Sequence, residues 1–591
     1  MPLTLFGSGE SRFSVVIPVN AAPAVRYAAE EFIKYFKEAC SAELNLLTGD
    51  IGCPANRIMI GLGISEERLA DCGNEGFVIQ TTNEKVIIAG KTPRGTLYGV
   101  YTFLEDYLGI RFFTPDITHI PKSLNISVES GIDRLKKPAF EYREPCFREV
   151  FDGDWAARLK TNGNWPTLTE KHGGKTKYGM FGHSFQALCS PENYFDEHPE
   201  YFAEIDGVRL REKTQLCLTN TEVLSIVTKN VLEYIKQNPD VNIVSVSQND
   251  NENYCRCENC RKVDEEEGSQ SGNIVRFVNA VAEAVEKEYP DIAIDTFAYA
   301  YSRKSPKFVK PRKNVIVRLC NIERCFLHPV TERCPTWPKT RTGEEDCTFA
   351  DELIKWGRLT DRIYIWDYYV NFIHYPLPHP ILHVFKPNLT FYKQNGVRGV
   401  FEQGSLCSDN SYFAELKAYL LSRLLWNPDI DDKVVIDEFF AGVYKSAAPV
   451  MKRIYDEFYT DVLKDNFHLF FTMHAEVMYK ALNLENMKKY DNLFEEAETL
   501  ADNDMVLYEI NKANMWLRYL KIYKTPMGTP GRNELIDQYI TDCALYNMIA
   551  FEELFTLYES QKWMKQSMDP ERHNYDDSDN ISLSEFPGFI D

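Results

Sequence analysis

Short apolar runs and two helical patterns alternate over the first 130 residues. From Ala24 to Ala39, apolar residues recur at helical spacing with charged residues opposite, which predicts a helix that buries one face. A second helix is expected from about Arg94 to Tyr107. Expected strands are Ser14 to Pro18, Arg57 to Gly61, Gly76 to Gln80 and Lys85 to Gly90. This order predicts a small α/β sandwich domain over residues 1–130, with two helices packed on an open sheet.

Eight apolar runs follow between Phe140 and Gln403, with helical or loop segments between them. This is the spacing of βα units, and the helix expected from Asn273 to Lys287 is the clearest intervening element. The runs are Tyr142 to Arg148, Tyr178 to His183, Thr214 to Leu218, Asn242 to Val246, Ile292 to Phe297, Asn314 to Leu319, Arg362 to Trp366 and Val397 to Phe401. Eight such units predict a closed (β/α)₈ TIM barrel over residues 131–427.

The pattern after Glu415 is helical, and few strand signals remain. The first of these helices should end near Trp426, because Pro428 disfavours a helical conformation at Asn427. Expected helices are Glu415 to Leu425, Asp431 to Leu463, Leu484 to Asp502, Asp504 to Tyr523 and Arg532 to Met564. We expect a C-terminal helical domain over residues 428–591, with an acidic tail from Pro570 that holds no regular structure.

Charge and composition narrow the classes of partner. A formal charge of -21 without any Lys/Arg-rich block disfavours nucleic acid, and no apolar stretch is long enough to span a membrane. The N-terminal residues lack a signal-peptide pattern, and the 15 cysteines are scattered. The sequence as given favours the cytoplasm, or the periplasm or exterior if a signal peptide was trimmed; the oligomeric state stays open.

Polar residues follow nearly every expected barrel strand. Active sites of (β/α)₈ enzymes lie at the C-terminal ends of the strands, so these residues are candidates for substrate contact. They are Arg148, His183, Asn220, Asn249, Tyr299, Tyr301, Arg324, Trp366 and His374. Aromatic rings can stack on sugars while amides and histidines bond to hydroxyl groups; the alternative for each aromatic residue is ordinary core packing.

Acidic residues follow three of the same strands. Asp250 and Glu252 follow the fourth, Asp367 the seventh and Glu402 the eighth. Hydrolysis of a glycosidic bond needs two carboxyl groups, one protonated and one ionised. These four are therefore the candidate catalytic residues, and the alternative for each is a helix cap or a surface ion pair.

Three cysteines, Cys255, Cys257 and Cys260, form a tight cluster after the Asp250 loop. Three thiolates are one short of a closed structural zinc site, so a fourth ligand would come from elsewhere. Candidates for it are Cys320, Cys325, Cys334 and Cys347. A structural zinc, a disulfide and free thiols all stay open, and no cofactor is expected to be required for catalysis.

Two sets of segments resemble known families. The segment GKTPRGTLYGVYTFLEDYLGIRFFTPD, residues 90–116, resembles the end of the N-terminal domain of glycoside hydrolase family 67 α-glucuronidases and of β-hexosaminidases. The segments SQNDNENYCRCENC, CNIERCFLHP, WDYYVNFIHY and GVFEQG resemble a bacterial domain of unknown function that is often joined to such a domain. The resemblance covers roughly residues 10–430.

The resemblance implies sugar chemistry and roles for particular carboxyl groups. By position, Asp367 and Glu402 are similar to the late Asp/Glu pair that activates water in family 67. No residue matches that family's acid equally well, and the candidates are Asp250 and Glu252, with Glu323 behind them. We therefore expect a glycoside hydrolase acting on a poly- or oligosaccharide, with α-glucuronidase-like activity as the finer prediction. The alternative is a barrel that binds carbohydrate without cleaving it.

Overall fold

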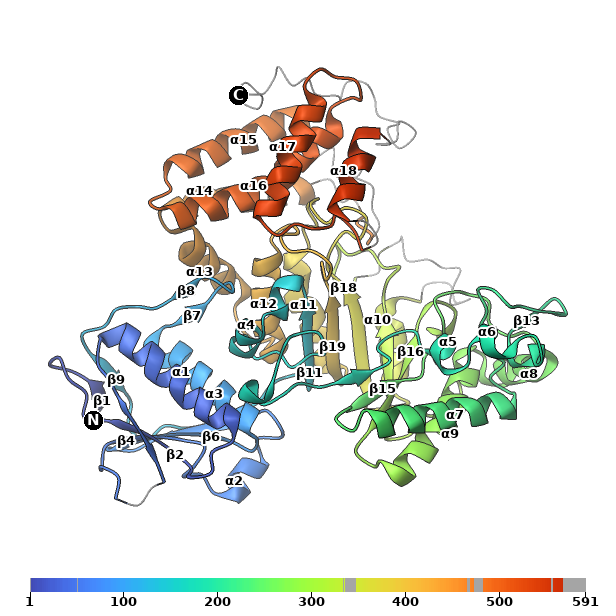
Figure 1. The fold of residues 1–591 in the computed structure, drawn as a ribbon, viewed down its shortest axis with the longest axis horizontal. Helices are drawn as coiled ribbons and strands as arrows, with labels where there is room; N and C mark the ends of the chain where they lie inside the picture. The colour runs from blue at the N-terminus through green and yellow to red at the C-terminus, as the bar shows by residue number, and fades with distance from the viewer. Residues whose placement is uncertain are drawn as a thin grey trace. The chain divides into compact units, whose positions relative to one another are not determined.

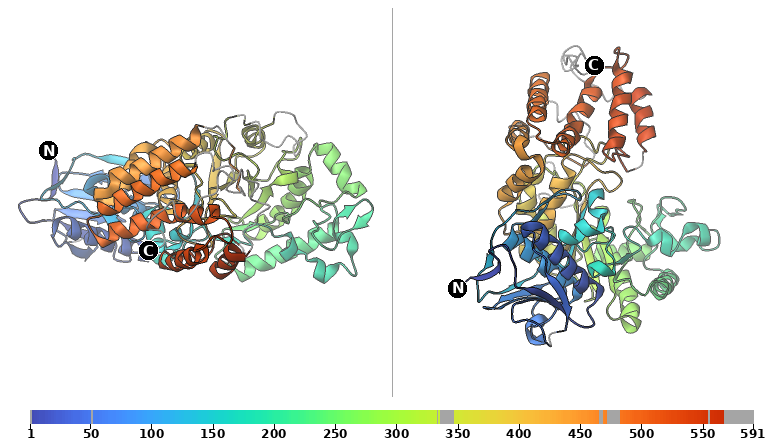
Figure 2. Two further views of the ribbon diagram at one scale, coloured as in Figure 1. Left: turned by 90° about the horizontal axis from the view of Figure 1, so that it is seen from above. Right: turned by 60° about the vertical axis from the view of Figure 1, so that its left-hand side comes forward.

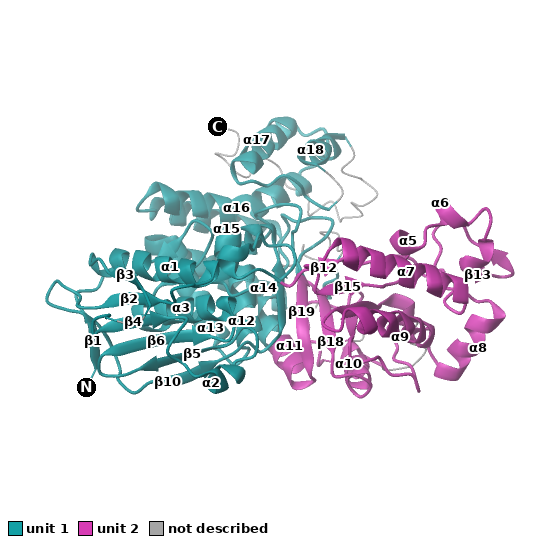
Figure 3. Ribbon diagram, turned by 60° about the horizontal axis from the view of Figure 1, so that its bottom comes forward, with its two compact units in different colours: residues 1–175, 369–386, 403–591 teal, residues 176–368, 387–402 magenta. Residues whose placement is uncertain are grey.

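The computed structural model describes residues 2–49, 52–332, 334, 347–464, 468–471, 482–553 and 556–566. The chain divides into two compact units (Figures 1 and 3). Unit 1 comprises residues 1–175, 369–386 and 403–591, and unit 2 comprises residues 176–368 and 387–402. No described helix is both long and apolar enough to cross a bilayer.

Unit 1 begins with a six-stranded sheet in the order β10-β5-β6-β4-β2-β3. Its strands are β2 (Ser14–Ile17), β3 (Asn45–Thr48), β4 (Arg57–Ile60), β5 (Phe77–Thr81), β6 (Lys85–Gly90) and β10 (Asp133–Lys136). Helices α1 (Pro23–Cys40) and α3 (Pro93–Leu108) contact each other and the sheet. A Cβ on Gly99 of α3 would lie 2.7 Å from the Ile88 side chain, so this glycine lets helix and sheet approach closely. The expected four strands and two helices are confirmed.

Smaller elements accompany this sheet. They are β1 (Leu3–Phe6), β7 (Arg111–Phe112), β8 (Thr118–His119), β9 (Ile126–Val128) and α2 (Glu66–Ala70). The strands pair two by two, β1 with β9 and β7 with β8. They are too short to show a clear period in the sequence.

Unit 2 contributes six neighbouring strands with the order β12-β15-β16-β17-β18-β19. They are β12 (Tyr178–Gly179), β15 (Ile243–Ser245), β16 (Ala293–Ala298), β17 (Val315–Cys320), β18 (Ile363–Tyr368) and β19 (Val397–Gln403). The pairs from β12 to β18 are parallel, so their C-terminal ends lie at one edge of the sheet. The structure thus shows a parallel half-barrel sheet, and a complete eight-stranded barrel stays a prediction.

Helices cover one face of this half-barrel. They include α7 (Thr221–Gln237), α9 (Ser271–Glu288), α10 (Phe349–Gly357) and α11 (Leu382–Gln394), and α8 (Glu258–Glu267) packs on α9. Buried valines of α7 and α9 pack together and on the strands. Shorter elements precede α7, namely α5 (Phe185–Leu188), α6 (Pro191–Tyr194), β13 (Glu204–Ile205) and β14 (Val208–Arg209).

One of the eight expected strands is wrong. The first run forms β11 (Tyr142–Cys146) in unit 1, but the third, Thr214 to Leu218, forms no strand of the unit 2 sheet and makes only an isolated bridge through Leu216. Its backbone is used elsewhere, because Cys217 N–H donates to the Tyr201 carbonyl and Ala203 N–H to the Gln215 carbonyl. An apolar run reveals burial but not its partner strand.

The other face of the half-barrel is filled by a buried ion pair among aromatic rings. Arg318 Nε lies 3.2 Å from Asp295 Oδ1, and neither side chain is exposed. The Arg318 guanidinium lies over the rings of Tyr178 and Phe181, at 4.5 and 4.7 Å from their centroids. The sheet interior is therefore a packed core, and substrate access is expected at the strand ends.

The C-terminal part of unit 1 is helical, as expected (Figures 1 and 2). It contains α12 (Ala414–Trp426), α13 (Asp432–Tyr444), α14 (Ala448–Leu463), α15 (Leu484–Thr499), α16 (Asp504–Lys524), α17 (Arg532–Leu545) and α18 (Leu557–Gln566). Each helix from α12 to α17 contacts the next helix along the chain.

Two expected long helices are each broken. The segment Asp431 to Leu463 breaks near Lys445, which has a positive φ, and α14 restarts with Pro449 in its first turn, where the absent N–H costs nothing. The segment Arg532 to Met564 ends at Leu545, before Asn547 with φ 55°. The expected unstructured tail from Pro570 lies outside the described residues.

Candidate active site

Three predicted site residues of unit 2 meet at the C-terminal edge of its sheet. The Tyr299 hydroxyl donates to Asp250 Oδ1 at 3.1 Å, and His183 Nε2 lies 3.8 Å from the same oxygen. These residues follow β16, β15 and β12. The Asp250 side chain is 69% exposed, so a substrate can reach it. Sequence reasoning from strand ends therefore found a real cluster.

The histidine of this cluster is oriented by the backbone. His183 Nδ1 lies 2.6 Å from the Gln248 carbonyl oxygen, which only accepts, so Nδ1 carries a proton. Nε2 then faces Asp250. The ring also packs edge-on against Phe297, with centroids 5.1 Å apart. The imidazole is thus fixed beside the carboxylate.

A second carboxyl group, Glu323, lies beyond β17 at the same edge. It forms an ion pair with Arg303, whose Nε also lies 2.6 Å from Glu352. Burial raises the pKa of Glu352 to about 7. The pKa of Tyr299 is raised, first by burial and then by the negative charge of Asp250, with a smaller effect of Glu323. Tyr299 therefore stays protonated and donates to Asp250.

The loop that carries Asp250 is held by amide side chains. Gln215 Nε2 donates to the carbonyls of Asn249 and Asn251, each at 2.8 Å. The predicted substrate ligand Asn249 is itself part of this frame, since it donates to the Thr214 carbonyl and accepts from Gln186 N–H. The predicted acid Glu252 lies on the same loop and is exposed.

Two other predicted ligands have local structural roles. Asn220 caps α7, accepting from the N–H groups of Glu222 and Val223. Tyr301 stacks on Tyr254, with centroids 5.0 Å apart, and burial raises its pKa.

Asp367 and Glu402 lie near each other, within strands β18 and β19 rather than in the loops beyond them. Neither is exposed. Asp367 accepts from Arg324 Nη2 at 3.0 Å and from the hydroxyl of Tyr392, on α11, at 2.8 Å. Both Glu402 oxygens lack a hydrogen-bond partner among the described residues. Burial raises the pKa of Glu402, and the Asp367 charge raises it further.

This placement corrects the expectation that the pair lines the mouth of the barrel. Neighbouring residues on a strand point to opposite faces of the sheet. Trp366 packs against Phe401 and Phe297 on the interior face, at centroid distances of 4.5 and 5.4 Å, so Asp367 and Glu402 point toward the helices. The predicted ligand Trp366 therefore packs in the interior of the sheet. The predicted ligand Arg324 pairs with Asp367 on the helix-covered face.

The predicted ligands Arg148 and His374 belong to unit 1. His374 is buried and lies 2.8 Å from the Tyr519 hydroxyl. Arg148 lines a cavity of about 450 Å³ and pairs with Asp409 at 3.7 Å.

The same cavity contains two carboxyl groups that sequence reasoning missed. Burial raises the pKa of Glu149 to about 8 and that of Asp409 to about 6. Glu149 directly follows the predicted Arg148, which was the available signal. A cavity of this size suits a small ligand.

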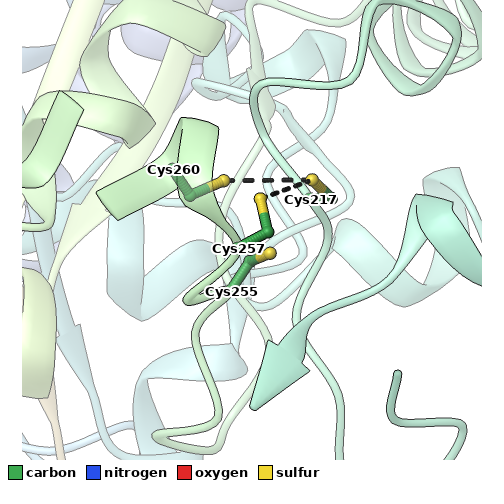
Figure 4. A group of neighbouring side chains, drawn as sticks. All are labelled: Cys217, Cys255, Cys257 and Cys260. Carbon is green, nitrogen blue, oxygen red and sulfur yellow. Dashed lines mark hydrogen bonds between the residues drawn. The ribbon is translucent and has the colours of Figure 1, made fainter. Parts of the chain in front are cut away.

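The cysteine cluster gains a member that was not predicted. Cys217 joins Cys255, Cys257 and Cys260, and all four are buried (Figure 4). The candidates for a fourth member, Cys320, Cys325, Cys334 and Cys347, were therefore wrong. The signal lay in the third apolar run, which contains Cys217.

Family comparisons agree with the resemblance seen in the sequence. Residues 112–456, more than half of the chain, match the family model described as Domain of unknown function (DUF4838). The chain belongs to this family. Residues 8–103 match the model of the glycosyl hydrolase family 67 N-terminus. No curated protein sequence matches the chain.

Two solved structures share the fold over nearly the whole chain. One is a family GH115 4-O-methyl-α-glucuronidase with specificity for decorated arabinogalactans; identity is 14%, TM-score 0.54, and coverage 98% of this chain and 80% of that one. The other is a GH138 enzyme targeting pectin rhamnogalacturonan II; identity is 11%, TM-score 0.51, and coverage 97% of this chain and 78% of that one. This DUF4838 member therefore has the fold of glycoside hydrolases.

Proposed function

We propose that this protein is a glycoside hydrolase whose catalytic carboxyl groups are Asp250 and Glu323. The observation that carries the proposal is the meeting of Asp250, Tyr299 and His183 at the C-terminal edge of the parallel sheet. Enzymes with parallel α/β barrels place their chemistry at this edge, and two solved structures that share this fold are glycoside hydrolases.

The surroundings of the two carboxyl groups suit different roles. Glu323 pairs with Arg303, which holds its carboxyl group in place beyond β17, and we assign it the role of base or nucleophile. Asp250 lies in the exposed loop beyond β15, so the glycosidic oxygen of a bound sugar can reach its carboxyl group. We assign Asp250 the proton-donating role.

The finer proposal concerns the substrate. We propose that the protein removes a branching sugar from a plant polysaccharide. The family 67 N-terminal match supports this, as does the similarity to an α-glucuronidase and to a pectin-targeting enzyme. We propose that the cleaved residue is a uronic acid.

A glycan screen tests this function. Wild-type protein incubated with glucuronoxylan, arabinogalactan and pectin fragments should release a monosaccharide, detected by chromatography. An Asp250→Asn variant should release none, while Asp240→Asn, an exposed carboxylate paired with Lys177, should match the wild type. Tight sugar binding by calorimetry with no turnover of any glycan would support the non-catalytic alternative instead.

The cavity of unit 1 offers a second location for the same chemistry. The raised pKa values of Glu149 and Asp409 support this location, since such shifts cluster at functional sites. Loss of turnover in Asp409→Asn together with full activity in Asp250→Asn would move the catalytic site to that cavity.

A further inference from the structure

The four cysteines of unit 2 come from two separate segments. Cys217 lies just before α7, and Cys255, Cys257 and Cys260 span the end of the Asp250 loop and the first turn of α8. Their sulfur atoms all lie within 4.8 Å of one another. Figure 4 shows the four side chains converging on one point.

The spacing of the sulfurs suits a tetrahedral metal. Zinc–thiolate bonds of about 2.3 Å in a tetrahedron place the sulfurs about 3.8 Å apart. Cys217 Sγ lies 3.8 Å from Cys257 Sγ and 3.9 Å from Cys260 Sγ. A disulfide would instead bring two sulfurs to about 2.05 Å, and all four thiols are free.

Polar groups contact two of the sulfurs. The Glu204 N–H donates to Cys255 Sγ at 3.4 Å, and Arg209 Nη1 lies 3.7 Å from the same sulfur. The Thr219 hydroxyl lies 3.2 Å from Cys260 Sγ. Ligands of a metal are commonly oriented by such surrounding contacts.

We propose that Cys217, Cys255, Cys257 and Cys260 bind one structural zinc ion. A closed four-thiolate set leaves no open coordination position, so the ion has no catalytic role. It links the segment around Cys217 to the loop that carries Asp250. Gln215, two residues before Cys217, holds that loop through Asn249 and Asn251, so the metal fixes both sides of this contact.

Metal analysis of the full chain tests the proposal independently of any activity. Protein purified without chelators or a histidine tag should contain one zinc ion per chain, measured by inductively coupled plasma mass spectrometry. Cys217→Ser and Cys257→Ser should lose it, while Cys189→Ser, a buried free cysteine elsewhere in unit 2, should keep it. Zinc-free wild-type protein with four reactive thiols, or full zinc content in Cys217→Ser, would overturn the site.

Measurements on wild-type protein keep the proposal testable if the cysteine variants do not fold. Wild-type protein produced with cobalt should show the strong thiolate-to-metal and ligand-field absorption of tetrahedral cobalt. Removing the metal from wild-type protein should speed hydrogen exchange in residues 246–257 more than in α9. Octahedral cobalt bands, or unchanged exchange in the Asp250 loop, would contradict the proposal, and neither depends on glycan cleavage.

Discussion

At the residue scale, acidic residues near the strand ends differ in role because their side chains point in different directions. Asp250, Asp367 and Glu402 all follow or end apolar runs. Asp250 lies in an exposed loop, whereas Asp367 and Glu402 lie within β18 and β19 on the helix-covered face. Their positions were predictable from the sequence. Their faces were not, because a shift of one residue in a strand end reverses the direction of the side chain.

Tyr299→Phe tests the hydrogen bond at the centre of the proposed site. A typical hydrogen bond contributes about 0.5–1.5 kcal/mol, so its loss should lower kcat/KM by roughly 2- to 10-fold. The control is Tyr194→Phe, whose ring contacts Tyr201 instead and which should leave turnover unchanged. Equal kinetics for both variants would remove Tyr299 from the site.

Glu402→Gln tests the buried carboxyl through pH. Burial raises the pKa of Glu402, so the folded chain keeps a proton that the unfolded chain releases above its ordinary pKa near 4.5. The protonated Glu402 carboxyl group therefore makes its full contribution to the free energy of unfolding below the ordinary pKa. This contribution is lost as pH rises toward the raised pKa, by up to about 1.4 kcal/mol per pH unit.

Glutamine does not titrate, so the stability of Glu402→Gln relative to wild type should increase between about pH 5 and about pH 8. Urea unfolding at several pH values measures this difference. Glu233→Gln, on the exposed face of α7, should show no such trend. A constant difference for Glu402→Gln would mean that the carboxyl titrates normally in the fold.

At the element scale, periodicity predicted helices and strands well where one face packs on a single partner. The helices α1, α3, α9 and α16 and most sheet strands follow their apolar patterns closely. Predictions failed where backbone partners are irregular, as in the third run, or where one apolar pattern continues across a break, as at Lys445. In both cases the deciding contact is tertiary or conformational.

Gly399→Ala tests the packing of β19 on β18. An added Cβ would lie 2.7 Å from the buried Tyr364 ring, so we expect about 1–3 kcal/mol lower stability. Gly357→Ala, at the end of α10 with its nearest atom at 3.6 Å, should be neutral or up to about 1 kcal/mol more stable. Denaturant unfolding compares them, and equal stability of both would contradict this packing.

At the scale of the whole molecule, the order of elements predicted the architecture better than it predicted the site. The N-terminal α/β sheet, the parallel strands and the C-terminal helices are confirmed, and the family resemblance agrees with the DUF4838 match. Of the predicted site residues, His183, Asp250 and Tyr299 converge at one edge of the sheet. Cys217 was missed, since only the fold brings residues 40 positions apart together.

The most direct test of the central claim is turnover by Asp250→Asn and Glu323→Gln on the glycan that the wild type cleaves. Loss of general acid–base catalysis lowers rates by about 10²- to 10⁴-fold, so both variants should fall in this range or below while keeping the wild-type unfolding midpoint. Near wild-type turnover by a folded Asp250→Asn variant would contradict the account.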